Sequence, residues 1–139
     1  MINILYRTRA TATGGRTGTA SVDDGALSLA LPTPKELGGA GANPEQLFAC
    51  GYAACFLGAI KFVAGRRKLR IADNSTVSAE VGIGSREDGR GFGLDVALKI
   101  ALPGVDIATA SELVEEVHIV CPYSHLTRNG LDVRLSLSA

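Results

Sequence analysis

The first thirty residues contain short runs in which apolar and polar positions alternate, a pattern typical of half-buried β-strands. The predicted strands cover residues 2–6, 17–22 and 26–31. Asp23-Asp24-Gly25 is typical of a tight hairpin turn and joins the last two strands. Residues 32–41 contain two prolines and three glycines, so they are predicted to form a loop.

A long apolar helix is predicted to begin after this loop. Asn43 suits the N-cap, Pro44 the first helical position and Gln46 the capping-box position. Residues 47–60 carry no charge and place apolar or small side chains on every face. This run is shorter than the about 18 residues of a membrane span, and Lys61 follows it. We therefore expect a core helix that is buried on all sides.

The second half of the chain contains further strand and helix patterns. Alternating runs at residues 76–83 and 92–102 predict two strands around a turn-rich segment. Asp106 can cap a second helix, which presents one apolar face and ends at Cys121-Pro122. Residues 131–137 alternate again and predict a last strand. This order of elements indicates an α+β fold rather than a doubly wound parallel sheet.

The length of 139 residues fits one domain over residues 1–139. A domain of this size buries only about two-thirds of the surface of its unfolded chain, and a small sheet covers only one side of a helix. An isologous homodimer, in which the apolar helices of two chains pack together between sheets, supplies the missing cover. The sequence therefore predicts a homodimer.

The charge of the chain limits the partners that we expect, and its first residues indicate the compartment. The chain has 14 basic and 14 acidic residues, and its one basic run lies at residues 66–70. Binding to nucleic acid through phosphates normally needs a basic excess, so we expect no nucleic acid partner. The first residues lack the pattern of a secretory signal, which favours the cytoplasm. Permanent disulfides are rare there, so each of the three cysteines is a packing residue, a metal ligand or a redox-active thiol.

The cysteines differ in what their positions allow. Cys50 and Cys55 lie five residues apart on the predicted helix, about 7.5 Å along its axis and on different faces. That separation is too large for a disulfide, so we expect Cys50 to pack as a small apolar residue. Cys55 and Cys121 lie on different helices and are free to meet. They are either two inert buried thiols or a peroxidatic thiol and a resolving thiol that a turn beside Pro122 can swing toward it.

A zinc site is a further alternative for the same region. His118, Cys121 and His125 are spaced three and four residues apart, and Cys55 would complete four nitrogen and sulfur ligands. Pro122 interrupts the helical spacing between Cys121 and His125, and no CxxC or HxxxH pair supports the site. We therefore rank zinc below the redox hypothesis.

A peroxide-reducing cysteine must be a thiolate, which a nearby cation stabilises. Arg16 lies between glycines in Gly14-Gly15-Arg16-Thr17-Gly18, a segment able to fold over a pocket. The alternative is a solvated arginine in a turn. Glu45 can orient the guanidinium of Arg16, because guanidinium and carboxylate match in fork geometry.

Three segments carry motifs that are specific together: GGRTG with the DDG turn after it, TPKELGGAGANPEQLFACGYAACFLGAI, and VCPYSHLTRNGLDV. With these segments, the sequence resembles the organic hydroperoxide resistance (Ohr) branch of the OsmC-like peroxidases over nearly its whole length. The resemblance implies an intertwined homodimer with central buried helices packed against antiparallel-rich sheets. It also implies thiol-dependent reduction of organic hydroperoxides, including those of fatty acids, in the oxidative stress response.

The resemblance also assigns roles to residues of this sequence. It implies that Cys55 is the peroxidatic thiol, that Cys121 is the resolving thiol, and that Arg16 and Glu45 form the activating network. The resulting disulfide would be reduced by a lipoylated protein or another dithiol, with no haem, flavin or metal cofactor. A non-catalytic dimeric binding module on the same fold, with the cysteines as core residues, is the alternative function.

Helix geometry makes one part of this assignment difficult. Glu45 and Cys55 are ten residues apart, which corresponds to about 15 Å along a straight helix. The helix would have to bend or break, with Gly51 the obvious site, or the long Arg16 side chain would bridge the gap, or the partner subunit would supply one group. We predict that Arg16 reaches both Cys55 and Glu45 in the reduced protein.

Apolar side chains near the reactive thiol would favour bulky alkyl peroxides over hydrogen peroxide. The alternative for these side chains is ordinary core packing. The candidate substrate-binding residues are Phe48, Phe56, Tyr123 and Leu126.

Overall fold

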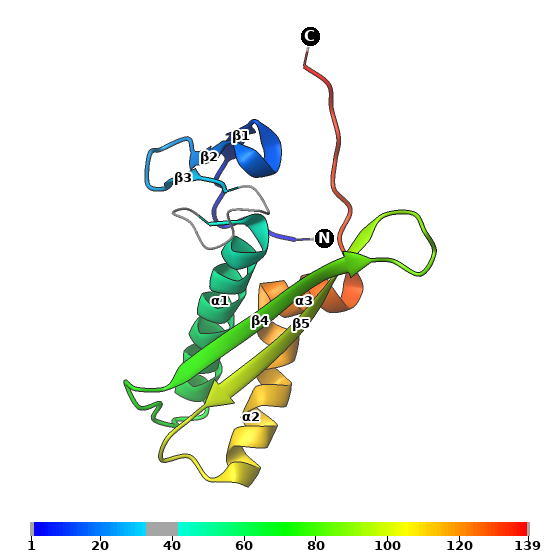
Figure 1. Ribbon diagram of the computed structural model, residues 1–139. Coiled ribbons are helices and arrows are strands. Elements are labelled where there is room, and N and C mark those ends of the chain that lie inside the picture. Colours follow the sequence, from blue (N-terminus) through cyan, green and yellow to red (C-terminus); the bar gives the residue numbers. More distant parts are fainter. Residues whose placement is uncertain (1, 33–41, 139) are drawn as a thin grey trace. The chain divides into compact units, whose positions relative to one another are not determined.

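The structure is a computed structural model that describes residues 2–32 and 42–138 (Figure 1). The chain divides into two compact units, Met1–Phe48 and Ala49–Ala139. Except for Pro32, the predicted loop over residues 32–41 lies outside the described residues. The single domain over residues 1–139 stays a prediction.

The first unit contains a small antiparallel sheet in the order β1-β2-β3. The predicted hairpin turn joins β2 to β3, and Gly25 adopts a φ of 79°, a left-handed conformation that favours glycine. Asp24 accepts a hydrogen bond from the backbone N–H of Ala26, which stabilises the turn. The elements are β1 (Ala10–Thr13), the short 3-10 helix η1 (Gly15–Thr17), β2 (Thr19–Val22) and β3 (Ser28–Ala30).

Two predicted strands, at residues 2–6 and 131–137, are absent, so these predictions were wrong for the single chain. Both segments have strand-like alternation, but neither pairs with a strand in the described part of the chain. A strand needs a neighbour for its backbone groups and a surface for its apolar face. Without either, their large apolar side chains stay exposed, as Leu5 at 93% and Leu135 at 91% illustrate.

Helix α1 (Pro44–Arg66) begins in the first unit and continues through the second. The predicted capping box is present: Asn43 Oδ1 accepts from the Gln46 N–H at 2.8 Å, and Gln46 Oε1 accepts from the Asn43 N–H at 2.9 Å. The helix runs on through Gly51, so a break there, one of the three alternatives for bringing Glu45 toward Cys55, is excluded. By length and composition α1 could cross a membrane, but the core helix of a soluble protein passes the same test.

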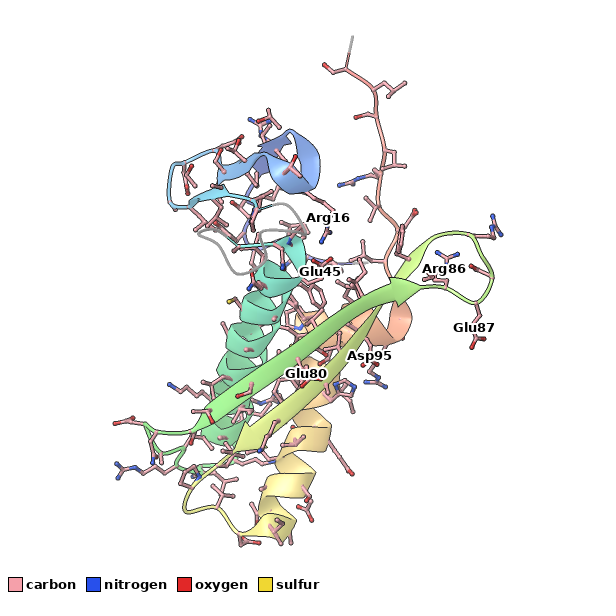
Figure 2. The ribbon with its side chains drawn as sticks, viewed as in Figure 1. Arg16, Glu45, Glu80, Arg86, Glu87 and Asp95 are labelled. Atoms are coloured by element: carbon pink, nitrogen blue, oxygen red, sulfur yellow. The ribbon has the colours of Figure 1, made fainter. Side chains whose placement is uncertain are left out.

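The second unit combines most of α1 with a long hairpin and two more helices (Figure 1). Strands β4 (Thr76–Ser85) and β5 (Phe92–Ala101) pair antiparallel along their whole length, close to the predicted bounds. Residues Val77, Ala79 and Val81 are half-buried, whereas the labelled Glu80 and Asp95 lie on the exposed face of the hairpin (Figure 2). The predicted α+β class is confirmed.

Helix α2 (Ile107–Val120) begins at the predicted cap, where Asp106 accepts from the Thr109 N–H at 3.1 Å. Helix α3 (Pro122–Asn129) was not predicted, because Pro122 was interpreted only as the end of α2. Proline also suits the first position of a helix, where its missing N–H and fixed φ cost nothing. The chain therefore turns a corner at Cys121 and starts a new helix.

The core of the second unit lies along one stripe of α1 and the facing side of α2. On α1 the buried residues recur every three or four positions, at Tyr52, Phe56, Ala59, Ile60, Val63 and Ala64. The single chain covers only this stripe of α1, so full burial of the helix in a homodimer stays a prediction. Its other side leaves an uncovered face, which consists of Cys50, Ala54, Gly58 and Phe62. Cys50 is thus exposed rather than packed in the core.

Candidate active site

Two free thiols meet between α1 and the corner that joins α2 to α3. The Sγ atoms of Cys55 and Cys121 lie 3.6 Å apart, although the residues are 66 positions apart in sequence. Cys121 is fully buried and Cys55 partly so. A disulfide bond is about 2.05 Å long, so the sulfurs are in contact but need a further approach before they can bond. The structure thus brings together the two cysteines that the sequence singles out.

Cys121 is held in a corner between two helices rather than in a free turn. Its backbone is extended, with φ −63° and ψ 124°, while α2 ends before it and α3 begins after it. The Cys121 N–H donates to the Val117 carbonyl at 2.8 Å, and the Cys121 carbonyl accepts from the His125 N–H at 2.9 Å. Both backbone groups are therefore fixed, and side-chain rotation is the simplest motion left to the thiol.

The surroundings of Cys55 favour the protonated thiol. Burial is the main cause that raises the pKa of Cys55, and the neighbouring Cys121 raises it further. A backbone hydrogen bond from Tyr123 acts in the opposite direction but does not outweigh burial. A cation close to Cys55 would be needed to make it a reactive thiolate at neutral pH.

Aromatic side chains pack around the dithiol. The Tyr52 and Tyr123 ring centroids lie 5.7 Å apart, and those of Tyr52 and Phe56 lie 6.4 Å apart. A Cβ on Gly51 would lie 2.8 Å from the Tyr123 hydroxyl, so Gly51 makes room for the Tyr123 side chain. This close approach, rather than a helix break, accounts for the glycine at this position.

The predicted substrate-binding residues have different environments. Phe56 is 1% exposed and packs in the core, so in the single chain it does not line an open surface. Tyr123 and Leu126 are partly exposed on α3. Phe48 is also partly exposed and belongs to the first unit. Contact of these side chains with a substrate stays a prediction.

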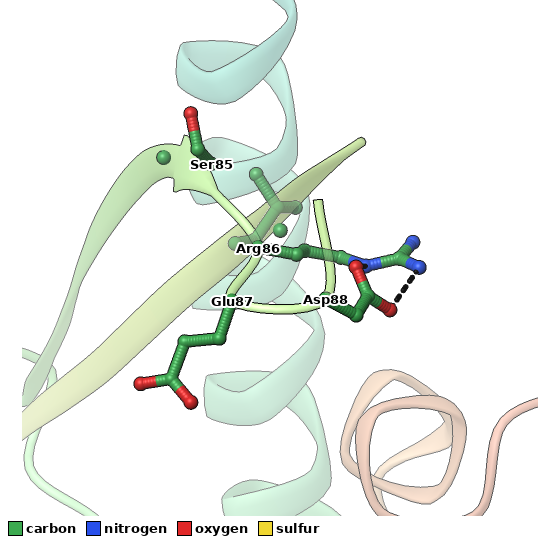
Figure 3. A pocket seen from close by; sticks show the side chains of 7 residues that line it. Ser85, Arg86, Glu87 and Asp88 are labelled. Atoms are coloured by element: carbon green, nitrogen blue, oxygen red, sulfur yellow. Dashed lines mark hydrogen bonds and ion pairs between the residues drawn. The ribbon is translucent and has the colours of Figure 1, made fainter. Parts of the chain in front are cut away.

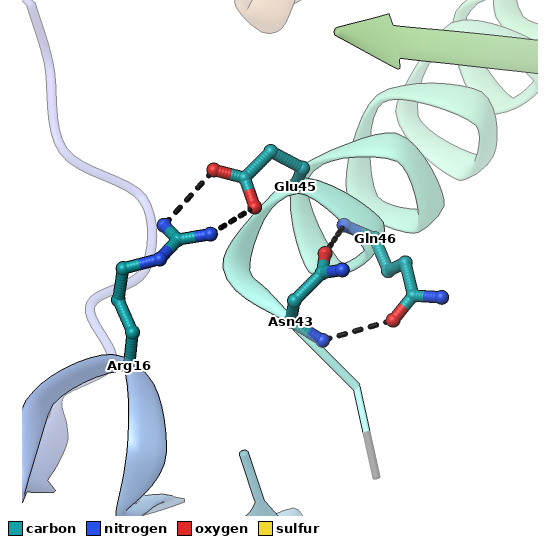
Figure 4. A network of polar contacts seen from close by, with 4 residues as sticks. All are labelled: Arg16, Asn43, Glu45 and Gln46. Carbon is teal, nitrogen blue, oxygen red and sulfur yellow. Dashed lines mark hydrogen bonds and ion pairs between the residues drawn. The ribbon is translucent and has the colours of Figure 1, made fainter. Parts of the chain in front are cut away.

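The predicted ion pair is present in the first unit. Arg16 donates from both terminal nitrogens to the Glu45 carboxylate, at 3.0 and 2.7 Å (Figures 2 and 4). Glu45 lies in the first turn of α1, and its side chain is 13% exposed, against 48% for Arg16. The hydrogen bonds from Arg16 lower the pKa of Glu45, and those to Glu45 raise the pKa of Arg16. Both groups are therefore charged at neutral pH, while contact of Arg16 with Cys55 stays a prediction.

A buried hydroxyl chain beside the dithiol was missed by the sequence analysis. Ser124 Oγ lies 2.7 Å from the Tyr52 hydroxyl and 2.8 Å from His118 Nδ1. Tyr52 precedes Cys55 by one helical turn, and Ser124 follows Cys121 by the same number of residues. That matched spacing was the available signal, but its meaning depends on α3, which was not predicted.

The zinc alternative has no support from the geometry. Within residues 2–32 and 42–138, no group of three or more histidine, cysteine, aspartate or glutamate residues is placed to hold a metal ion. His118 instead contacts Ser124.

A shallow hollow at the turn between β4 and β5 is lined by charged side chains, among them Arg86, Glu87 and Asp88 (Figure 3). There the guanidinium of Arg86 pairs with Asp88 at 2.7 Å and Glu87 points away from that pair. The Asp88 carboxylate also accepts from the Arg90 N–H at 2.9 Å, so these residues stabilise the turn.

Comparison with known proteins extends over most of the chain. Residues 37–136 match the family described as OsmC-like protein. An organic hydroperoxide resistance protein of Xanthomonas axonopodis pv. citri is 52% identical over 138 residues, which cover 97% of this chain and 96% of the relative.

Two crystal structures show the same fold. The organic hydroperoxide resistance protein of Elizabethkingia anophelis is 49% identical, with a TM-score of 0.82 and coverage of 92% of each chain. The organic hydroperoxide resistance protein OhrB of Bacillus subtilis is 40% identical, with a TM-score of 0.83 and coverage of 97% of this chain and 100% of that one. The sequence matches and the structural matches therefore point to the same group of proteins.

Proposed function

The chain belongs to the OsmC family, with relatives named for organic hydroperoxide resistance, and on this premise we propose that it is a thiol-dependent peroxidase. Its substrates would be organic hydroperoxides, including those of fatty acids, and its products the corresponding alcohols. The observation that carries the proposal is the contact of two free thiols, Cys55 and Cys121, at 3.6 Å.

In the proposed reaction the Cys55 thiolate attacks the distal oxygen of the hydroperoxide. The O–O bond breaks, the sulfur becomes a sulfenic acid, and the alkoxide leaves and takes up a proton to give the alcohol. The Cys121 thiol then attacks the sulfenic sulfur. The S–S bond forms, the S–O bond breaks, and water leaves, so one peroxide has been reduced by two thiols.

The disulfide must then be reduced to complete the cycle. A dithiol, such as the lipoyl group of a lipoylated protein, would attack it by thiol–disulfide exchange and become oxidised to its own disulfide. Every electron in this cycle is carried by sulfur, so the proposal assigns no haem, flavin or metal to the protein.

Arg16 and Glu45 are proposed as the activating groups. Because burial raises the pKa of Cys55, a cation must offset that effect and can also stabilise the leaving alkoxide. The bidentate contact with Glu45 fixes the plane of the Arg16 guanidinium and keeps it charged. Apolar contacts from Phe48, Phe56, Tyr123 and Leu126 would favour alkyl peroxides.

We also propose that the protein is a cytoplasmic homodimer. The uncovered face of α1 consists of small and apolar residues, with the Arg66 guanidinium 5.6 Å over the Phe62 ring at its end. The segments at residues 2–6 and 131–137 have strand-like patterns without partner strands in the described part of the chain. A second copy could cover the face and pair with the segments. Sedimentation velocity should give a dimer for the wild type. Ala54→Arg, which places a charge on the uncovered face, should give a monomer, and an unchanged dimer would refute this use of the face.

The decisive experiment is turnover with cumene hydroperoxide or tert-butyl hydroperoxide and dihydrolipoamide. The wild type should consume peroxide and form one disulfide per chain when the reductant is omitted. If wild type and Cys55→Ser consumed peroxide equally slowly, the chain would be a binding module with inert cysteines. A panel of peroxides and reductants in the same assay would identify the substrate class and the preferred dithiol.

A further inference from the structure

A chain of hydrogen-bonded side chains beside the dithiol, called here the hydroxyl chain, consists of Tyr52, Ser124 and His118. It links α1, which carries Cys55, to the corner between α2 and α3, which carries Cys121. The Tyr52 hydroxyl comes from α1, Ser124 Oγ from the first turn of α3, and His118 Nδ1 from the last turn of α2. Ser124 is fully buried and Tyr52 nearly so, at 0% and 3% exposed. Buried hydroxyls that lose their partners are costly, so this chain resists separation of the three helices.

The two hydroxyl residues Tyr52 and Ser124 have the same spacing in sequence from the two cysteines. Tyr52 lies three residues before Cys55 on α1, and Ser124 lies three residues after Cys121. One helical turn is 3.6 residues, so residues three apart lie on nearly the same face. The Tyr52–Ser124 hydrogen bond and the Cys55–Cys121 contact are therefore two neighbouring links between the same elements.

A second set of contacts strengthens the link. Thr127 Oγ1 donates to the Ser124 carbonyl at 3.0 Å and lies 3.4 Å from the Tyr52 hydroxyl. The Phe56 and His118 rings also lie 6.5 Å apart, between α1 and α2. The corner at Cys121 is thus held from both sides of the cysteine.

We propose that Tyr52, Ser124 and His118 are positioning residues for the step in which Cys121 captures the oxidised Cys55. This inference rests on the proposed function. The sulfurs must close from 3.6 Å to about 2.05 Å, and misplacement by about 1 Å can slow such a step by orders of magnitude. A sulfenic acid that is not captured reacts with a second peroxide and becomes a sulfinic acid, which dithiols do not reduce.

The hydroxyl chain should therefore control how much of the Cys55 sulfenic acid forms the disulfide with Cys121 and how much is oxidised further to sulfinic acid. The hydrogen bonds of the hydroxyl chain join Tyr52, Ser124 and His118 to one another, whereas the Cys55 sulfur contacts Cys121, so the first oxidation should depend on the hydroxyl chain less than the capture step does. Tyr52→Phe is the primary variant, because it removes only the hydroxyl and keeps the ring between Phe56 and Tyr123.

The test follows each sulfur species by intact-protein mass spectrometry after rapid mixing with cumene hydroperoxide. Dimedone in parallel samples traps sulfenic acid. In Tyr52→Phe and Ser124→Ala, disulfide formation should slow by about tenfold or more, while the first oxidation of Cys55 stays within about twofold of wild type. With excess peroxide, these variants should accumulate sulfinic acid at Cys55.

Conservative and double variants separate positioning from general loss of structure. Ser124→Thr keeps the hydroxyl, and His118→Asn places an amide near the position of Nδ1, so each should restore part of the capture rate that Ser124→Ala and His118→Ala lose. The double variant with Tyr52→Phe and Ser124→Ala should be little slower than Ser124→Ala, because Ser124→Ala already removes the Tyr52–Ser124 hydrogen bond. Ser111→Ala, on the exposed side of α2, is the matched control and should behave as wild type.

The outcomes distinguish the inference from the function on which it rests. If wild type formed neither sulfenic acid nor disulfide, the proposed function and this inference would both fail. If wild type formed the disulfide and Tyr52→Phe formed it equally fast without extra sulfinic acid, the function would stand and the positioning role would be refuted. A lower unfolding temperature with unchanged capture would likewise refute it, because that result describes a purely structural hydrogen bond.

Discussion

The dithiol and the ion pair are opposite in their physical character. Cys121 is fully buried and Cys55 partly so, and burial raises the pKa of Cys55. Arg16 and Glu45 are charged, and their mutual hydrogen bonds stabilise the ionised form of each. The dithiol brings two sulfurs into contact in surroundings that disfavour the Cys55 thiolate, while the ion pair contains a cation and no nucleophile. Peroxidase activity would require both.

Removal of the nucleophile is the strongest test of this division. Cys55→Ser should lower the consumption of cumene hydroperoxide with dihydrolipoamide by about a thousandfold or more, because no other thiol can take its place. Cys50→Ser is the matched control, since Cys50 takes no part in the proposed reaction and the change from sulfur to oxygen is small. Equal loss in both variants would mean that the choice of Cys55 is wrong.

Removal of the positive charge should have the next largest effect. In the proposed activation Arg16 offsets the effect of burial, so Arg16→Met should raise the pKa of Cys55 further and lower the thiolate fraction at neutral pH about tenfold for each unit of the rise. The rate of alkylation by iodoacetamide as a function of pH measures this directly. Arg16→Lys should lose less, because it keeps the charge but not the fork. Identical profiles for wild type and Arg16→Met would separate the ion pair from the thiol chemistry.

Steric crowding beside the dithiol gives a smaller effect. In Gly51→Ala the new Cβ would approach the Tyr123 hydroxyl to 2.8 Å, so the ring must shift. Crowding of about 1–3 kcal/mol would outweigh the about 1 kcal/mol that alanine gains over glycine within a helix. Gly65→Ala, with open space around its Cβ, should be stabilised by the helix term alone. Urea unfolding compares them, and equal stabilisation would show that Tyr123 does not depend on Gly51.

The pH dependence of the ion pair should be the smallest effect. Arg16 lowers the pKa of Glu45 in the folded protein, so the pair stabilises the fold above the pKa of Glu45 in the unfolded chain. This stability is lost as the pH falls through the lowered folded value. Glu45→Gln should therefore reduce the unfolding temperature by a few degrees or less at neutral pH and not at all in strong acid. A larger loss in acid would contradict the sign of the shift.

Local sequence determined the starts of α1 and α2 and the tight turns. The reciprocal hydrogen bonds of Asn43 and Gln46, and the cap at Asp106, occur where the sequence places them, because each needs only residues within one turn. The hairpins also follow their patterns, since alternation and turn residues act over a few positions. The pairing of Arg16 with Glu45 was predicted as well, from the fit of the two groups and from family resemblance.

Only the tertiary structure decided which groups surround the two sulfurs. The sequence identified Cys55 and Cys121, but not the corner formed by α3, the hydroxyl chain through Ser124, or the space that Gly51 leaves for Tyr123. It also predicted strands at residues 2–6 and 131–137 that do not form in the single chain. Capping and turns depend on neighbours in sequence, whereas burial, pairing and close approach depend on residues that folding brings together from distant positions.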